Sequence, residues 1–190
     1  FRRYGSDLLV VWDAEDPATD GNLKAALEVA RALCVRAQQA TKRKVDFTQI
    51  DKSVLDISKT RVSSLDRDYT NLVSVFQYLV GNTDFSMIQG IPGEACCHNH
   101  VLFGNEGEKI WSIPYDFDQT GLVNAPHAGP NPRFKLRSVR DRLYRGRCVN
   151  NDLLETTIAT FNAKHDEILA VLNEVSGLSE QSIKVTTRFV

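Results

Sequence analysis

Residues 71–86, NLVSVFQYLVGNTDFS, decide the fold of the rest of the chain, because they join a strongly apolar run to a polar turn. We predict a helix from about residue 65 that is buried on most of its sides, since its apolar positions are dense: Leu72, Val73, Val75, Phe76, Leu79 and Val80. Gly81 and Asn82 form a pair suited to a left-handed helix end. The turn carries one carboxylate, Asp84, which belongs either to a helix stop or to a reactive site.

Two apolar strings after this turn predict a β-hairpin. The segments 98–104 (HNHVLFG) and 109–117 (KIWSIPYDF) alternate or run apolar in the manner of strands, and NEGE at 105–108 is a turn between them. A proline-rich loop follows at 124–133. We then predict a helix near 138–146 and a long final helix from Asn151 to Val175, which buries one apolar face: Leu154, Ile158, Phe161, Ile168 and Leu172.

The first sixty residues are interpreted as a strand followed by helices. Residues 7–13 are a β-type run, and 22–40 carry apolar residues at helical spacing. A second helix is predicted over 47–62, with Ile50, Val54 and Ile57 on one face. No catalytic pattern is recognisable there. We therefore expect an α+β, mostly helical fold, with an accessory segment over 1–62 and the main domain over 63–190.

Length and composition favour one main domain with a real core. The chain has 190 residues, 42% of them hydrophobic and 25% charged, which is ordinary for a globular protein. The formal net charge of -1 gives no overall attraction to nucleic acid or to an anionic membrane. No run approaches the roughly 20 apolar residues that a membrane-spanning helix needs. Any partner recognised by charge must therefore bind a local cluster.

The four cysteines leave several interpretations open: Cys34, Cys96, Cys97 and Cys148. The adjacent pair is followed by His98 and His100, a combination that suggests zinc, but the paired C-x2-C spacing of structural zinc sites is absent. The alternatives are buried thiols, or a disulfide from one of the adjacent pair to Cys148, which would indicate an oxidising compartment.

Oxygen-bearing side chains stand at the ends of three predicted elements. Asp84 follows the buried helix, Asn99 opens the first strand, and Asp116 and Asp118 end the second. Polar groups at such places can converge while the backbone stays anchored. Carboxylate and carbonyl oxygens suit Mg²⁺, and a carboxylate on a turn is placed to accept a proton from an attacking hydroxyl. We interpret His127 as an ordinary loop residue.

The order of these motifs resembles the C-lobe of protein-kinase-like folds. More closely, YLVGNTD, HNHVLF and IWSIPYDFD are similar to the spore-coat CotH kinase family, over about residues 70–175, whereas residues 1–60 are not matched. The resemblance implies that Asp84 is the catalytic base and that Asn99 and Asp116 bind the metal, with Asp118 as a second ligand. It also implies Mg²⁺ and ATP as cofactors, and it favours an exported protein.

The chain departs from the kinase pattern in two respects. About fifteen residues separate Asp84 from Asn99, a longer gap than in typical kinases, and no glycine-rich phosphate loop or strand lysine is recognisable upstream. Two functions therefore remain open. The first is a kinase-like phosphotransferase that uses a Mg-nucleotide and acts on a possible protein substrate. The alternative is a non-catalytic kinase-like module that binds a partner or serves a structural role.

Residues 133–147 form a basic stretch with seven cationic side chains: Arg133, Lys135, Arg137, Arg140, Arg142, Arg145 and Arg147. Guanidinium groups suit phosphate and carboxylate recognition, so the stretch is a candidate site for nucleotide phosphates, an acidic substrate or nucleic acid. Arg140 and Asn82 are our candidates for nucleotide contact. The alternative is a solvated helix face paired with surface acids. Little aromatic interleaving supports stacking on single-stranded nucleic acid.

Overall fold

The computed structural model describes residues 2–4, 7–9, 53–93, 96–105, 107–175 and 178–190. Within these ranges the fold is α+β, as predicted, and the helix expected over 22–40 lies outside them. The helices are α2 (Arg67–Leu79), α3 (Asn151–Ala163), α4 (His165–Glu174) and α5 (Glu180–Thr187). The strands are β1 (Arg2–Tyr4), β2 (Asp7–Leu9), β3 (Ser53–Val54), β4 (His100–Gly104) and β5 (Trp111–Pro114).

Helix α2 confirms the predicted buried helix and its end. Asp66 caps its first turn, because its carboxylate accepts a hydrogen bond from the backbone N–H of Tyr69 at 2.8 Å. The helix buries Val73 and Val75 as well as the polar Asn71 and Gln77, so most of its sides contact protein. Gly81 follows the helix with φ of +66°, the left-handed conformation that ends many helices. The chain then turns into the segment that carries Asp84.

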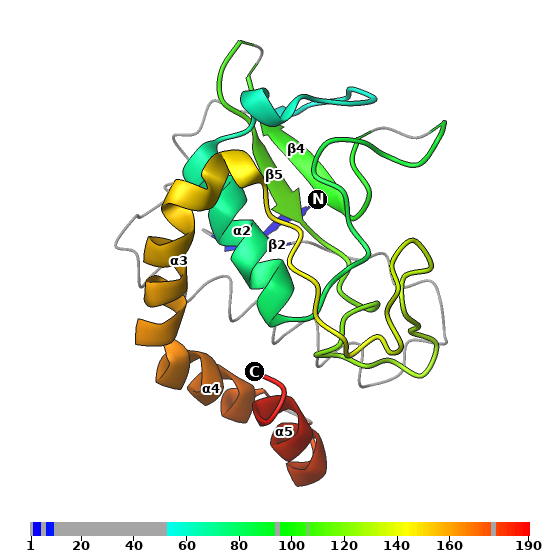
Figure 1. The fold of residues 1–190 in the computed structure, drawn as a ribbon, viewed down its shortest axis with the longest axis vertical. Coiled ribbons are helices and arrows are strands. Elements are labelled where there is room, and N and C mark those ends of the chain that lie inside the picture. Colours follow the sequence, from blue (N-terminus) through cyan, green and yellow to red (C-terminus); the bar gives the residue numbers. More distant parts are fainter. Residues whose placement is uncertain (1, 5–6, 10–52, 94–95, 106, 176–177) are drawn as a thin grey trace.

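The predicted hairpin is also confirmed. β4 and β5 pair antiparallel, with His100 opposite Pro114 and Phe103 opposite Trp111. Leu102, on the inner face of β4, is fully buried in the main core, which lies between the hairpin and α2. Figure 1 shows α2 between this hairpin and α3, with α4 and α5 at the end of the molecule away from the sheet. The hairpin therefore fixes residues 98–99 and 115–116 near each other.

The helix predicted over 47–62 is wrong in its described part. Residues 53 and 54 form β3, which pairs with the outer edge of β4. The backbone N–H of Leu55 bonds to the carbonyl of Leu102 at 2.9 Å, so the chain continues extended past the strand. Val54 is 48% exposed, whereas a helical face would have buried it. The open edge of β4 provides hydrogen-bond partners for the backbone of these residues. These hydrogen bonds outweigh the helical preference indicated by the spacing of the apolar residues.

The C-terminal helical region is divided in two, and the single helix predicted over 151–175 is wrong in this respect. α3 ends at Ala163 and α4 begins at His165. The two halves have different partners: α3 packs beside α2, whereas Leu172 of α4 is buried in a second apolar cluster with Val171. Ile158, expected in the core, is 42% exposed. No described helix is long and apolar enough to cross a membrane.

The helix predicted near 138–146 is wrong. Residues 141–147 have no regular secondary structure and run past the end of α2. Their arginines bond to backbone carbonyls of distant segments: Arg142 bonds to the carbonyls of Leu79 and Phe189, and Arg145 to that of Phe85. These charge-assisted bonds to distant carbonyls stabilise the segment without regular secondary structure. The described part of the chain is thus less helical than expected.

Candidate functional site

Asp84 lies on a turn that Asn82 shapes. The side-chain oxygen of Asn82 accepts a hydrogen bond from the backbone N–H of Asp84 at 2.8 Å, which is an Asx-turn. Asn82 is 1% exposed, and its amide nitrogen is buried without a hydrogen-bond partner. The structure therefore places Asn82 inside the turn as its organiser. Its predicted contact with a nucleotide stays a prediction.

Both carboxylate oxygens of Asp84 contact the segment that opens β4. His98 Nε2 lies 2.9 Å from Asp84 Oδ1. Asn99 Nδ2 donates to the backbone carbonyl of Asp84 at 2.7 Å and to Asp84 Oδ2 at 3.1 Å. Since both acceptors are oxygens, the amide nitrogen of Asn99 must face Asp84, and its Oδ1 points to the other side. The structure thus brings two of the predicted site residues into direct contact.

Asp116 lies two residues beyond β5, next to the same segment. The backbone N–H of Tyr115 donates to the carbonyl of Asn99 at 3.0 Å, which ties the two predicted metal ligands together through their neighbouring backbone. Both Asn99 and Asp116 have positive φ, at +53° and +55°, and such conformations are tolerated best by Asn and Asp among residues with side chains. The residue types at these positions therefore suit the backbone as well as the proposed chemistry.

Two neighbouring carboxylates act on Asp116 at this site. Burial, the charge of Asp118 and, to a smaller extent, that of Asp84 together raise the pKa of Asp116 from 3.8 to about 6. Asp118 in turn lies 2.8 Å from His127 Nε2, which was not predicted as a site residue. His127 lies nine residues after Asp118 in a proline-rich loop, and no sequence periodicity predicts that the two side chains meet. Concentrated negative charge of this kind favours binding of a cation.

The oxygen atoms of the predicted metal ligands are of a chemical type that binds hard cations. Asn99 Oδ1 and the carboxylates of Asp116 and Asp118 are oxygen ligands of the kind that Mg²⁺ prefers. Among the described residues no three His, Cys, Asp or Glu side chains are grouped as a metal site. The amide oxygen of Asn99 would therefore have to join the carboxylates of Asp116 and Asp118 in the ligand set of a bound metal. The expected separation of about 6 Å between Asn99 and Asp116 oxygens stays a prediction.

Arg145 is a site residue that the sequence pattern did not single out. Its Nη1 donates to the carbonyls of Thr83 at 3.0 Å and of Phe85 at 2.6 Å, the two residues on either side of Asp84. Its guanidinium also lies over the rings of Phe85 and Phe134, at 4.4 and 4.9 Å. Arg145 therefore holds the Asp84 turn in place. The basic stretch signalled cations here, but only the fold shows which one reaches the turn.

Arg140, the other predicted nucleotide contact, takes part in packing. Its Nη1 donates to the carbonyl of Gly121 at 3.2 Å, and its guanidinium lies over the ring of Phe189 at 4.6 Å. These contacts connect the basic stretch to the C-terminal residues. A role for Arg140 in nucleotide binding stays a prediction.

A small cavity opens beside Asp84. It has a volume of about 200 Å³ and is lined by six residues: Asp84, Gln119, Gly129, Pro130, Asn131 and Pro132. Asn131 Nδ2 donates to the carbonyl of Thr83 at 2.8 Å, and the N–H of Gly129 donates to Gln119 Oε1 at 3.3 Å. The proline-rich loop is thereby attached to the Asp84 turn. Asp84 therefore lines an open depression that the proline-rich loop borders.

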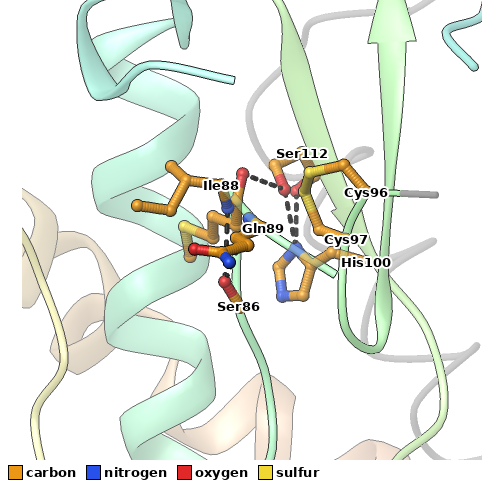
Figure 2. Close-up of a disulfide and its surroundings, with 8 residues drawn as sticks. Ser86, Ile88, Gln89, Cys96, Cys97, His100 and Ser112 are labelled. Carbon is orange, nitrogen blue, oxygen red and sulfur yellow. Dashed lines mark hydrogen bonds between the residues drawn. A yellow bond between two sulfur atoms is a disulfide. The ribbon is translucent and has the colours of Figure 1, made fainter. Parts of the chain in front are cut away.

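The cysteine predictions are corrected by the structure (Figure 2). Cys96 is joined to its neighbour Cys97 in a buried disulfide, and Cys148 is free and exposed. The predicted disulfide to Cys148 is therefore wrong. Cys148 begins the short 3-10 helix Cys148–Asn150 that leads into α3, and that position exposes its thiol.

His100 is a core residue, which argues against the zinc interpretation. Its Nε2 lies 3.0 Å from Gln77 Nε2, a donor, and its Nδ1 lies 2.9 Å from the hydroxyl of Ser112. The hydrogen-bond network therefore assigns the proton to Nδ1 and leaves Nε2 as an acceptor. Burial lowers the pKa of His100 to about 3, so the imidazole is neutral. Both ring nitrogens are occupied, and the adjacent cysteines are bonded to each other.

Comparison with protein-family models, with curated proteins and with solved structures finds no match to this chain. The resemblance to the CotH kinase family therefore stays a prediction.

Proposed function

We propose that the protein is a kinase-like phosphotransferase that uses a Mg-nucleotide. Asp84 is the general base, and Asn99 and Asp116 are metal ligands, with Asp118 as a further ligand. The observation that carries the proposal is that three distant segments bring these groups to one place. Asn99 bonds directly to Asp84, and the charges of Asp84 and Asp118 both act on Asp116.

The surroundings of Asp84 support its role as a positioned base. Its carboxylate is oriented by His98 and Asn99, and its backbone turn is held by Arg145 on both sides. It also lines a cavity, so a hydroxyl that enters has a proton acceptor within reach. General base catalysis depends on this kind of fixed geometry.

The metal ligands complete the proposed division of roles. Asn99 bonds to Asp84 through Nδ2, so its Oδ1 can coordinate a cation on the side away from the base. A Mg-nucleotide supplies the phosphoryl group when it is bound. Asp116 and Asp118 contribute negative charge that such a cation would neutralise. The same residues therefore link the base to the metal.

A non-catalytic module is the second candidate function, and one observation favours it. The charges that raise the pKa of Asp116 come from Asp118 and Asp84, and no lysine acts on it among the described residues. Kinases position nucleotide phosphates with such a lysine. In this alternative the carboxylates bind a cation or a partner without phosphoryl transfer.

The substitution Asp84→Asn separates these possibilities. Asn is nearly isosteric and forms turns almost as well as Asp, so folding and Mg-nucleotide affinity should stay close to wild type. Loss of the base should lower turnover by about 10²-fold or more. The matched control is Asp66→Asn, because Asp66 caps α2 and has no place in the proposed chemistry. It should leave both turnover and stability unchanged.

Nucleotide turnover and thermal stability are measured for the wild type and both variants. Equal turnover in wild type and Asp84→Asn would mean that Asp84 serves only the turn. A folded wild type that binds Mg²⁺ but shows no turnover would favour the non-catalytic module.

A further inference from the structure

Arg145, which bonds to both neighbours of Asp84, has two further arginines near it, and we call Arg133, Arg145 and Arg147 the arginine cluster. Burial lowers the pKa of Arg145, and the positive charges of Arg147 and Arg133 lower it further, whereas Asp84 acts in the opposite direction. The contacts agree with this grouping, because the guanidinium of Arg145 lies 4.9 Å from the ring centre of Phe134, the residue after Arg133, and Arg147 follows Arg145 by two residues. Holding like charges together costs free energy that a bound anion would recover.

The cluster has hydrogen-bond donors to spare. Arg145 uses Nη1 for two carbonyls, and its Nε and Nη2 have no partner among the described residues. Arg147 Nε is buried and without a partner. Arg133 is exposed, and only its backbone N–H is bonded, to the side chain of Asn131. In the described part of the chain no carboxylate forms an ion pair with these arginines.

The cluster lies at the edge of the cavity that contains Asp84. Asn131 and Pro132 line this cavity, and Arg133 is the next residue along the chain. Arg145 bonds to the two residues that flank Asp84. The volume of about 200 Å³ is below the usual range for pockets that hold a drug-sized ligand. The cavity therefore suits one side chain better than a whole nucleotide.

The aromatic residues beside the cluster argue for a peptide over nucleic acid. Phe85 is buried, with the guanidinium of Arg145 on its ring at 4.4 Å and the imidazole of His100 at 5.3 Å. Arg145 also covers Phe134, at 4.9 Å. Binding of single-stranded nucleic acid relies on open aromatic faces on which bases stack. Here the guanidinium of Arg145 already covers one face of each ring, whereas the free guanidinium donors suit carboxylate and phosphate oxygens.

We propose that the arginine cluster binds the acidic group of a peptide acceptor, so that a neighbouring hydroxyl side chain enters the cavity beside Asp84. This inference rests on the proposed phosphotransferase function and specifies its substrate class. The acidic group is a carboxylate or a phosphate on the peptide, since guanidinium groups recognise both by the same paired hydrogen bonds.

Peptide binding to the full chain tests this inference in an Asp84→Asn background, where turnover does not interfere. The probes are a synthetic peptide with one serine flanked by glutamates, the same peptide with phosphoserines in place of the glutamates, and a matched peptide with glutamines. The variants are Arg133→Gln and Arg147→Gln, and the control is Arg137→Gln. Arg137 is an exposed arginine of the same stretch, and it is not among the charges acting on Arg145.

We expect the glutamate or the phosphoserine peptide to bind at least about tenfold more tightly than the glutamine peptide, with the tighter of the two identifying the preferred acidic group. Arg133→Gln and Arg147→Gln should each weaken that binding by about five- to tenfold, and Arg137→Gln by less than about twofold. Circular dichroism checks that each variant is folded.

Two results would overturn the inference: equal affinity for acidic and neutral peptides, or equal losses in the cluster variants and in Arg137→Gln. Tighter binding of a single-stranded oligonucleotide at the same salt concentration would also overturn it. Its failure is distinguishable from failure of the proposed function. If the wild type binds acidic peptides selectively but shows no phosphoryl transfer, the peptide site is supported and the phosphotransferase function is not. If phosphoryl transfer occurs and is unchanged in Arg133→Gln and Arg147→Gln, the phosphotransferase function is supported and the peptide site is not.

Discussion

Replacing Asp116 by Asn should stabilise the metal-free protein at neutral pH. Burial and the charges of Asp118 and Asp84 raise the pKa of Asp116 from 3.8 to about 6. This difference corresponds to about 3 kcal/mol of unfavourable free energy for the ionised form, at 1.36 kcal/mol per pH unit. Asp116 is half-buried, and solvent screens part of this cost, so we expect about 1–2 kcal/mol. Asn tolerates the positive φ of this position equally well.

The sign of the pH dependence follows from the raised pKa. Between pH 3.8 and about 6 the folded protein binds a proton at Asp116 that the unfolded chain has already lost. The stabilising contribution of the protonated carboxyl is therefore complete below 3.8 and is lost as the pH rises through about 6. The gain from Asp116→Asn should be near zero at about pH 4 and should reach its full value at about pH 7.5.

Urea denaturation of wild type and Asp116→Asn at these two pH values measures the effect. Excess Mg²⁺ added at the higher pH should stabilise the wild type more than the variant, because the cation neutralises the negative charge of the ionised Asp116 carboxylate, which the variant lacks. No gain in the variant at the higher pH, or an equal gain at both pH values, would refute the assigned cost of ionising Asp116. Equal stabilisation of both proteins by Mg²⁺ would remove Asp116 from the proposed metal ligands.

Three further predictions concern the turn, the base and the free thiol. Gly81→Ala should lower the free energy of unfolding by about 2–3 kcal/mol, because a steric clash of the new methyl adds to the backbone strain of a positive φ. That methyl would lie 2.7 Å from a phenylalanine ring. Gly107→Ala, with positive φ but open space, should cost about 1–2 kcal/mol, and equal costs would contradict the packing argument. His98→Ala removes the group that orients Asp84 and should lower turnover about tenfold while unfolding changes by less than about 1 kcal/mol; unchanged turnover would exclude this role. Cys148 should react with iodoacetamide without reductant, as peptide mass mapping would detect, and an unlabelled Cys148 would contradict its exposure.

Local sequence signals were sufficient for α2 and for the β4–β5 hairpin. The dense apolar run and Gly81 specify a buried helix and its end, because both act within a few residues. The two apolar strings around Gly107 likewise specify neighbouring strands. The same signals placed Asp84, Asn99 and Asp116 at the ends of these elements, where their backbone is anchored. The contact between Asp84 and Asn99 confirms that two of these ends meet, and metal binding there stays a prediction.

Elements that depend on distant partners were not predictable. Residues 53–54 form a strand only because β4 offers an open edge. Residues 141–147 stay extended because Arg142 and Arg145 bond to carbonyls about sixty residues earlier in the chain. Local spacing favoured a helix in both places, and hydrogen bonds to the rest of the fold outweighed it.

The sequence by itself determined which chemical groups this protein carries and the elements that hold them: a buried helix, a hairpin and oxygen-bearing side chains at their ends. Only the tertiary structure decided how those groups are used. It brought Arg145 into hydrogen-bond contact with the Asp84 turn, buried His100 as a neutral core residue, and joined Cys96 to Cys97 instead of Cys148. The physical reason is that periodicity and turn preference act over a few residues, whereas side-chain partners, burial and pKa depend on segments that meet only in the folded chain.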